Sequence, residues 1–164
     1  SGVGKTNAAA ATQFAIQSGA TEIINYGVAG GLEASMQVCD VFEVESTVQY
    51  DFDLTQVNGN MIGTLNEYAT PYFFLDVKGL FPHAKVATGD RFNDSDVDND
   101  LITQSLACTL RDMECAAIAH VCEKCDVPFY AFKCVSDVRG GGSMPGQYID
   151  NLRRCMEKIT GILK

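Results

Sequence analysis

Two residue pairs in the second half of the sequence could perform acid–base chemistry. Met113-Glu114 and Ser136-Asp137 each place a carboxylate just after a short apolar run that is typical of a buried strand. A lone carboxylate at the start of a helix is often only a capping charge. Two carboxylates at neighbouring strand ends instead favour a division of labour, in which one holds hydroxyl groups while the other passes a proton.

Several separate segments must fold together to position these pairs. Polar or glycine-rich clusters follow four apolar runs and occupy residues 27–32, 89–94, 112–114 and 136–137. In open α/β sheets, ligands bind outside the carboxyl ends of the strands. We therefore expect the four clusters to converge on a single site at one edge of the sheet.

The order of helical and extended patterns predicts the fold class. Helices are expected over 5–18, 113–124 and 146–163, and strands over 22–26, 38–50, 85–88, 106–110 and 127–135. Asn58-Gly59 predicts a hairpin within 56–63. Because strands and helices alternate, we expect an α/β protein with a largely parallel sheet flanked by helices. The 164 residues correspond to a single domain over 1–164.

Composition and charge argue against several classes of partner. Lys and Arg number 12 against 21 for Asp and Glu, so the net charge is −9. That balance disfavours nucleic acid or an anionic membrane as the main partner. No apolar run approaches the length of a bilayer span, and the first residues do not resemble a signal peptide. The seven cysteines favour reduced, mostly buried thiols, which are typical of a cytoplasmic protein.

Motifs for nucleotide or calcium binding are incomplete. Ser1-Gly-Val-Gly-Lys-Thr ends like a P-loop, but no strand with a clear magnesium-binding Asp accompanies it. The acidic run over 94–100 mimics a calcium loop, yet it has Asn99 and Ser105 where that loop needs Gly and Glu. A solvated acidic loop is the expectation there.

Cysteine and histidine spacing gives no stronger metal signal. Cys122 and Cys125 have zinc or redox spacing, but no second pair follows at zinc-ribbon spacing. His120 lies on an apolar helical face, where we expect a hydrogen-bonded packing role. The sequence therefore predicts neither a metal site nor a cofactor.

Five ordered motifs resemble the signatures of the nucleoside phosphorylase superfamily, and most closely its methylthioadenosine/S-adenosylhomocysteine nucleosidase branch. They are Ser1-Gly-Val-Gly-Lys, Asn25-Tyr-Gly-Val-Ala-Gly-Gly-Leu32, Thr88-Gly-Asp-Arg-Phe-Asn93, Asp112-Met-Glu-Cys-Ala-Ala-Ile-Ala-His-Val-Cys122 and Lys133-Cys-Val-Ser-Asp137. Their order and spacing hold from residue 1 to the final helix. The resemblance implies a three-layer αβα sandwich around a central mixed, largely parallel sheet, usually in a homodimer.

The resemblance also implies hydrolysis of the N-ribosidic bond of a small-molecule purine nucleoside. Asp137 would protonate or hydrogen-bond the purine N7 as the base leaves, and Ser136 would help to orient Asp137. The bond breaks through an oxocarbenium-like transition state, so charge leaving on the base must be neutralised. A carboxyl group can supply that proton near neutral pH if burial raises its pKa.

Substrate-binding residues follow from the same resemblance. Glu114 would hold the ribose hydroxyls, and Met113 would pack against the sugar. The other implied contacts are Ser1 beside the nucleophile, Gly27, Phe92 stacked on the base, the backbone of Asn93 at the edge of the base, and Asp112.

Departures from the family pattern keep other functions open. In the nucleosidases, an earlier strand and loop carry a glutamate that activates the water. That segment would precede residue 1, so we expect this chain to bind a nucleoside but to turn it over slowly. Lys133 stands where these enzymes commonly have arginine, and the stretch between 50 and 89 is short. The alternatives are a phosphorylase that uses phosphate and a non-catalytic nucleoside-binding protein. A P-loop NTPase is the weakest alternative.

Overall fold

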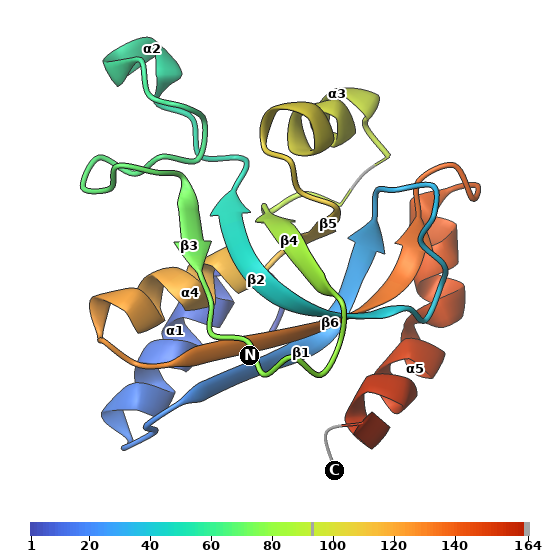
Figure 1. Cartoon of the computed structure of the whole chain (residues 1–164), viewed down its shortest axis with the longest axis horizontal. Helices are drawn as coiled ribbons and strands as arrows, with labels where there is room; N and C mark the ends of the chain where they lie inside the picture. Colours follow the sequence, from blue (N-terminus) through green and yellow to red (C-terminus); the bar gives the residue numbers. More distant parts are fainter. Residues whose placement is uncertain (93, 163–164) are drawn as a thin grey trace.

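Strands and helices alternate along the chain, as Figure 1 shows for a computed structural model that describes residues 1–92 and 94–162. The helices are α1 (Lys5–Gln17), α2 (Thr55–Asn58), α3 (Asp96–Asp100), a π-helical turn η1 (Leu101–Ser105), α4 (Cys115–Lys124) and α5 (Met144–Ile162). The strands are β1 (Ile23–Gly31), β2 (Val41–Gln49), β3 (Tyr72–Phe74), β4 (His83–Thr88), β5 (Leu110–Asp112) and β6 (Phe129–Val138). The α/β class is therefore confirmed.

The six strands form one mixed sheet that curls back on itself. Their order is β3-β2-β4-β5-β1-β6, and an additional pairing of β2 with β6 closes the ring. The β1–β6, β2–β4 and β4–β5 pairings are parallel, whereas β1–β5, β2–β3 and β2–β6 are antiparallel. The expectation of a sandwich around an open sheet is wrong in this respect, because the sheet is a small closed barrel with β3 on its edge.

A bulge in β2 explains the closure. Val44 pairs with Ala84 and Ser46 pairs with Lys85, which leaves Glu45 as an extra residue on β2. A bulge bends the strand that carries it and increases its twist. The first residues of β2 can therefore pair with β6 while its later residues pair with β4 and β3. No feature of the sequence pattern marks this bend.

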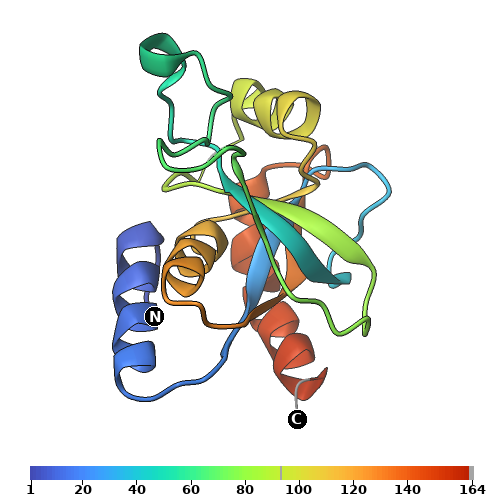
Figure 2. The same ribbon diagram turned by 60° about the vertical axis from the view of Figure 1, so that its left-hand side comes forward.

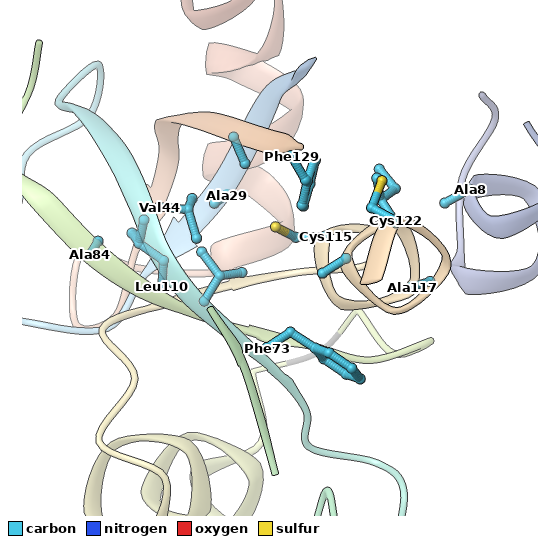
Figure 3. Close-up of a cluster of buried hydrophobic side chains, with 14 of the residues drawn as sticks. Ala8, Ala29, Val44, Phe73, Ala84, Leu110, Cys115, Ala117, Cys122 and Phe129 are labelled. Carbon is cyan, nitrogen blue, oxygen red and sulfur yellow. The ribbon is translucent and has the colours of Figure 1, made fainter. Parts of the chain in front are cut away.

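Helices cover the barrel from two sides. α4 packs against β2, β3 and β4 and is covered in turn by α1, while α5 packs against β6 and β1. Figure 2 shows the α1–α4 pair side by side and α5 apart from it. Between α4 and the strands lies the main apolar cluster, in which Val44, Leu110 and Phe129 contact the helix residues that Figure 3 labels. This packing fixes the start of α4 relative to the strand ends.

The boundaries of some elements differ from the expectation. β1 continues through the glycine-rich segment to Gly31, where a loop was expected after Tyr26. The strand expected over 106–110 is instead β5 at Leu110–Asp112, preceded by the turn η1. The Asn58-Gly59 hairpin is wrong, because Gly59 has a φ of 71° and ends the short helix α2. β3 was not expected at all.

The acidic run is less solvated than expected. It folds as α3, and Arg139 bridges Asp96 and Asp100 with N–O distances of 2.9 Å each. Asp98 is buried, and Asp94 accepts a hydrogen bond from the Met144 amide at the start of α5. The run therefore caps a helix and pairs with a cation, roles that solvation alone does not describe.

Two further observations concern membrane-spanning helices and the packing of His120. Over residues 1–92 and 94–162, no helix has both the length and the apolar character that a bilayer span requires. His120 stacks on Phe73 with ring centroids 5.2 Å apart, so the packing role is confirmed. Its Nε2 has no hydrogen-bond partner among the described residues and lies 3.9 Å from Glu67 Oε1.

Candidate active site

A cavity at the carboxyl ends of the strands has a volume of about 390 Å³, which is within the usual range for small-molecule sites. It is lined by residues 1–3, 25–30, 91–92 and 111–114, by Lys133, by residues 136–137, and by Tyr148 and Met156. All four strand-end clusters contribute to it, so their expected convergence is confirmed. Eight expected site residues line it: Ser1, Gly27, Phe92, Asp112, Met113, Glu114, Ser136 and Asp137. Asn93 lies outside the described residues.

Ser136 and Asp137 owe their position to an irregularity in the β1–β6 ladder. Ala29 pairs with Val135 and Gly30 pairs with Asp137, so Ser136 is an extra residue on β6. Bulges re-aim side chains and are common next to active sites. The Ser136 hydroxyl donates a hydrogen bond to Asp137 Oδ1 at 2.6 Å. The bulge therefore places both side chains together at the cavity.

Gly30 makes room for the Asp137 carboxyl group. A Cβ atom at residue 30 would lie 2.8 Å from Asp137 Oδ2 and 3.0 Å from Met144 Cε. Both distances are below or at the limit for real Cβ contacts, so a side chain at residue 30 would displace the carboxyl group or the Met144 methyl group. The glycine-rich segment is therefore part of a strand rather than a loop, and the Asp137 side chain lies close to its backbone at Gly30.

Asp137 is a buried acid that has no ion-pair partner at contact distance within residues 1–92 and 94–162. Asp137 is 2% exposed to solvent. Burial raises the pKa of its carboxyl group, while the hydrogen bond from Ser136 and the charge of Arg111 partly oppose that rise. Such a group keeps its proton to a higher pH than an ordinary aspartic acid, which is what proton donation requires.

Asp112 lies on β5, on the other side of β1 from Asp137, and both of its carboxylate oxygens are engaged with the protein. Its Oδ2 lies 2.7 Å from Lys133 Nζ and accepts the Cys115 amide at 3.0 Å. Its Oδ1 accepts the Thr88 hydroxyl at 2.6 Å. Burial opposes the Lys133 charge, but the Asp112 carboxylate, together with Cys115 and Glu114, more than offsets burial and raises the lysine pKa. This buried ion pair anchors the first turn of α4 to β4 and β6.

Glu114 connects the start of the chain to the cavity. Its Oε1 accepts a hydrogen bond from the Gly4 amide at 2.8 Å. Burial raises the pKa of its carboxyl group, and the Gly4 bond partly opposes this. The same loop is held by Lys5, whose ammonium lies 2.6 Å from Asp51 Oδ1. Because Lys5 is paired with a carboxylate, the loop does not present the free lysine that a P-loop needs.

Two aromatic side chains, Phe92 from the loop after β4 and Tyr148 from α5, line the cavity. The Phe92 and Tyr148 ring centroids are 4.9 Å apart, with an interplanar angle of 63°. Phe92 is 44% exposed, which leaves ring surface for a planar ligand. Met113 lines the same cavity beside Glu114. The site thus combines an apolar, aromatic part with two buried acids.

Sequence reasoning missed several lining residues. Tyr148 and Met156 come from α5, where helical periodicity gave no reason to separate them from the core. Asn25 lies on β1 inside one of the family-like motifs, and its buried Oδ1 has no partner in the described part of the chain. Asn25 could have been singled out, because a polar residue within a short buried strand needs a partner. Arg111 precedes Asp112 and could have been suspected for the same reason.

Comparison with known proteins places this arrangement in a family. Residues 1–164 match the family model described as the phosphorylase superfamily. A 5′-methylthioadenosine/S-adenosylhomocysteine nucleosidase from Anoxybacillus flavithermus is 32% identical over 159 residues, which cover 85% of this chain and 66% of the relative. The chain thus spans slightly less than two thirds of that relative's length.

Solved structures share the fold. The nucleosidase of that name from Neisseria meningitidis, in complex with methylthio-immucillin-A, has a TM-score of 0.85 and 28% identity, and the match covers 96% of this chain and 74% of that one. Futalosine hydrolase from Helicobacter pylori has a TM-score of 0.87 at 20% identity, over 95% of this chain and 72% of that one, which shows likeness of fold alone. This chain belongs to the phosphorylase superfamily.

Proposed function

We propose that this chain hydrolyses the N-ribosidic bond of a purine nucleoside of the methylthioadenosine or S-adenosylhomocysteine type. The observation that carries the proposal is Asp137, a buried carboxyl group with a raised pKa at the wall of the cavity. Membership of the superfamily supports the choice of bond. The Anoxybacillus relative and the Neisseria structure support the choice of nucleoside, through the names printed for them.

The proposed acid step uses Asp137 and Ser136. The bond between purine N9 and ribose C1′ breaks as its electron pair moves into the base, and the Asp137 proton moves to N7. Ser136 holds one oxygen of Asp137 at 2.6 Å, so the other oxygen is presented to the base. Water then adds to C1′ and gives a proton to solvent, which yields the free base and the free sugar, and Asp137 regains a proton from solvent. Ser1 and the adjoining loop lie where the water would approach.

The proposed binding step divides the nucleoside between two parts of the cavity. Phe92 stacks on the base with Tyr148 behind it, and the backbone of Asn93 contacts the edge of the base. Met113 packs against the sugar, and Glu114 accepts hydrogen bonds from its hydroxyl groups. Gly27 lets the sugar approach the β1 backbone closely, since no side chain projects there.

Asp112 takes a positioning role in this proposal. Both of its oxygens already accept hydrogen bonds or an ion pair from Thr88, Cys115 and Lys133. It therefore fixes the turn that carries Met113 and Glu114, and it contributes to substrate binding through that turn.

The wider setting is also a proposal. We propose that the chain forms one domain, assembles as a homodimer and works in the cytoplasm. All seven cysteines lie among the described residues and are free thiols, which suits a reducing compartment. The negative net charge suits a small neutral substrate better than a polyanion.

Adenine release from methylthioadenosine tests the function. We expect slow adenine formation that does not depend on phosphate, and we expect Asp137→Asn to lower kcat by about a hundredfold or more, the usual scale of general acid catalysis. Single-turnover assays with excess protein would measure both rates.

Three results would count against the proposal. Turnover that requires phosphate would identify a phosphorylase. Tight adenine binding by calorimetry without any release would identify a nucleoside-binding protein. Near-normal turnover by Asp137→Asn would remove Asp137 from the mechanism. An unchanged far-UV circular dichroism spectrum in Asp137→Asn would show that a loss of turnover does not come from misfolding.

A further inference from the structure

Three cysteines that are far apart in the sequence meet beneath α5. Cys39 comes from the loop between β1 and β2, Cys134 from β6 and Cys155 from α5, and their three sulfur atoms all lie within 4.8 Å of one another. Cys39 Sγ and Cys155 Sγ are 3.5 Å apart. Among the residues that the structure describes, this is the one place where three or more His, Cys, Asp or Glu ligand atoms gather so closely. We call Cys39, Cys134 and Cys155 the trithiol cluster.

The backbone around the trithiol cluster holds it in place. The Cys39 amide donates to Val135 O at 2.8 Å, and the Val135 amide donates to Asp40 O at 2.8 Å, so the loop is tied to β6. The Cys155 thiol donates to Val135 O at 3.2 Å. Cys39 also has a φ of 73°, a conformation that residues other than Gly, Asn and Asp rarely adopt. The packing around the loop therefore maintains this position against local strain.

The cluster offers sulfur and little else as a ligand. Phe132 and Ile159 are buried beside it, and Val41, Phe81 and Met156 pack around it. Hard cations such as Mg²⁺ and Ca²⁺ require oxygen ligands, so they do not suit this site. Zn²⁺ in structural sites is almost always bound by four ligands, whereas three thiols meet here. Soft thiolates favour Cu(I), and a planar three-coordinate site with metal–sulfur bonds of about 2.3 Å places its sulfurs about 4 Å apart.

We propose that Cys39, Cys134 and Cys155 form a three-coordinate binding site for Cu(I). Each thiol that binds the ion loses its proton to solvent and forms a Cu–S bond, and copper keeps its oxidation state. Cys134 and Cys155 are fully buried, whereas Cys39 is half-buried and provides the entry. Lys158, whose ammonium donates to Cys39 O at 2.7 Å, offsets part of the negative charge of the loaded site.

Metal ions bind cysteine as the thiolate, so loading the cluster displaces thiol protons. A metal that replaces these protons gains the sulfur ligands without moving any backbone segment, because the three sulfurs are already in contact range. The cluster is separate from the proposed catalytic site, since none of its three cysteines lines the active-site cavity.

Anaerobic titration with Cu(I) as its acetonitrile complex tests the proposal, with bathocuproine disulfonate as the competing chelator. We expect the fully reduced chain to hold one Cu(I) against the chelator, with X-ray absorption showing three sulfur ligands. Cys39→Ala should weaken that affinity at least tenfold. Cys125→Ala is the matched control, because Cys125 is also half-buried but lies outside the trithiol cluster.

Several outcomes would overturn the proposal. Equal affinity in Cys39→Ala and the unmodified chain would place the copper elsewhere. An equal loss in Cys125→Ala would identify non-specific thiol binding, and absorption data with two sulfur ligands would exclude the three-coordinate site. Far-UV circular dichroism on each variant confirms folding, and Cys39→Ser provides a second variant that keeps the size of the side chain.

Discussion

Asp112 and Asp137 are two buried aspartates on strands that flank β1, yet their surroundings differ in one decisive respect. Asp112 has Lys133 at 2.7 Å together with a hydroxyl and an amide donor. Asp137 has the Ser136 hydroxyl at 2.6 Å and no cation at ion-pair distance among the described residues. Their exposures, 8% and 2%, are similar. Both carboxyl groups are therefore buried, and they differ in that Asp112 has the Lys133 ammonium beside it.

The comparison separates structural acids from reactive acids. A buried carboxylate beside a cation gains a stable charge but cannot release a proton that it does not hold. A buried carboxyl group with only a hydroxyl beside it is disfavoured as an anion, so it retains its proton. Under the proposed function, Asp112 is the structural acid, which holds the turn at Met113, and Asp137 is the reactive acid at the wall of the cavity.

Removing the cation should have the largest effect on this contrast. Lys133→Met leaves the Asp112 carboxylate buried without a cationic partner, so we expect a loss of about 3–5 kcal/mol in the free energy of unfolding. Urea denaturation followed by circular dichroism would measure it. Adding Asp112→Asn to Lys133→Met should recover much of the loss, because no buried charge then remains.

An exposed pair provides the control for that prediction. Lys124 pairs with Glu67 at the surface, with N–O separated by 3.0 Å, and Lys124→Met should change stability little. If Lys133→Met were as mild as Lys124→Met, the Asp112–Lys133 pair would not be the buried anchor described above.

Crowding the reactive acid should have an intermediate effect. Gly30→Ala places a Cβ atom 2.8 Å from Asp137 Oδ2, so the carboxyl group or the strand must shift. Overpacking of this kind costs about 1–3 kcal/mol, and kcat should fall as well because Asp137 is displaced. Thermal unfolding and adenine release would measure the two effects.

A second glycine tests whether that effect is local. Gly161 lies in α5 with no atom within 4 Å of its added Cβ position, so Gly161→Ala should leave both quantities intact or raise stability slightly. Equal behaviour of the two alanine variants would mean that close approach at residue 30 does not matter.

The pH dependence of stability should show the smallest effect. The pKa of Asp137 is raised above its ordinary value of 3.8 in the folded chain, so the folded state holds that proton longer than the unfolded state. Its stabilising contribution is complete below 3.8 and is lost as the pH rises through the folded-state pKa. Asp137→Asn cannot ionise, so its stability relative to the unmodified chain should increase with pH across that window. Denaturant unfolding at several pH values would measure the difference, and a pH-independent difference would contradict the raised pKa.

Much of the site could be predicted from strand ends alone. The polar clusters after four apolar runs indicated where ligand-binding residues would gather, and Glu114, Ser136 and Asp137 all line the cavity. That reasoning works because ligand sites in α/β sheets lie at strand termini whatever the details of packing. The helices expected over 5–18 and 113–124 could also be predicted from the sequence, since alanine-rich and apolar helical patterns are local.

Features that depend on distant partners could not be predicted. Residues 27–31 resembled a loop, but their pairing with β6 continues β1 to Gly31, and Gly30 and Gly31 leave room beside the strand for Asp137 and Met36. The barrel closes through a bulge at Glu45 that no local pattern indicates. Cys39, Cys134 and Cys155 have no regular spacing, so only the folded chain brings them together.

Direct titration of the Asp137 carboxyl group tests the central claim. Nuclear magnetic resonance of chain labelled with ¹³C at the aspartate carboxyl carbons would follow it, with the signal assigned by its absence from Asp137→Asn. We predict a midpoint above 3.8 for Asp137, because burial disfavours its anion. Ser136→Ala should move the midpoint further upward, because the serine hydrogen bond stabilises the anion. A midpoint at or below 3.8, or a downward shift in Ser136→Ala, would contradict the assignment of Asp137 as the protonated acid.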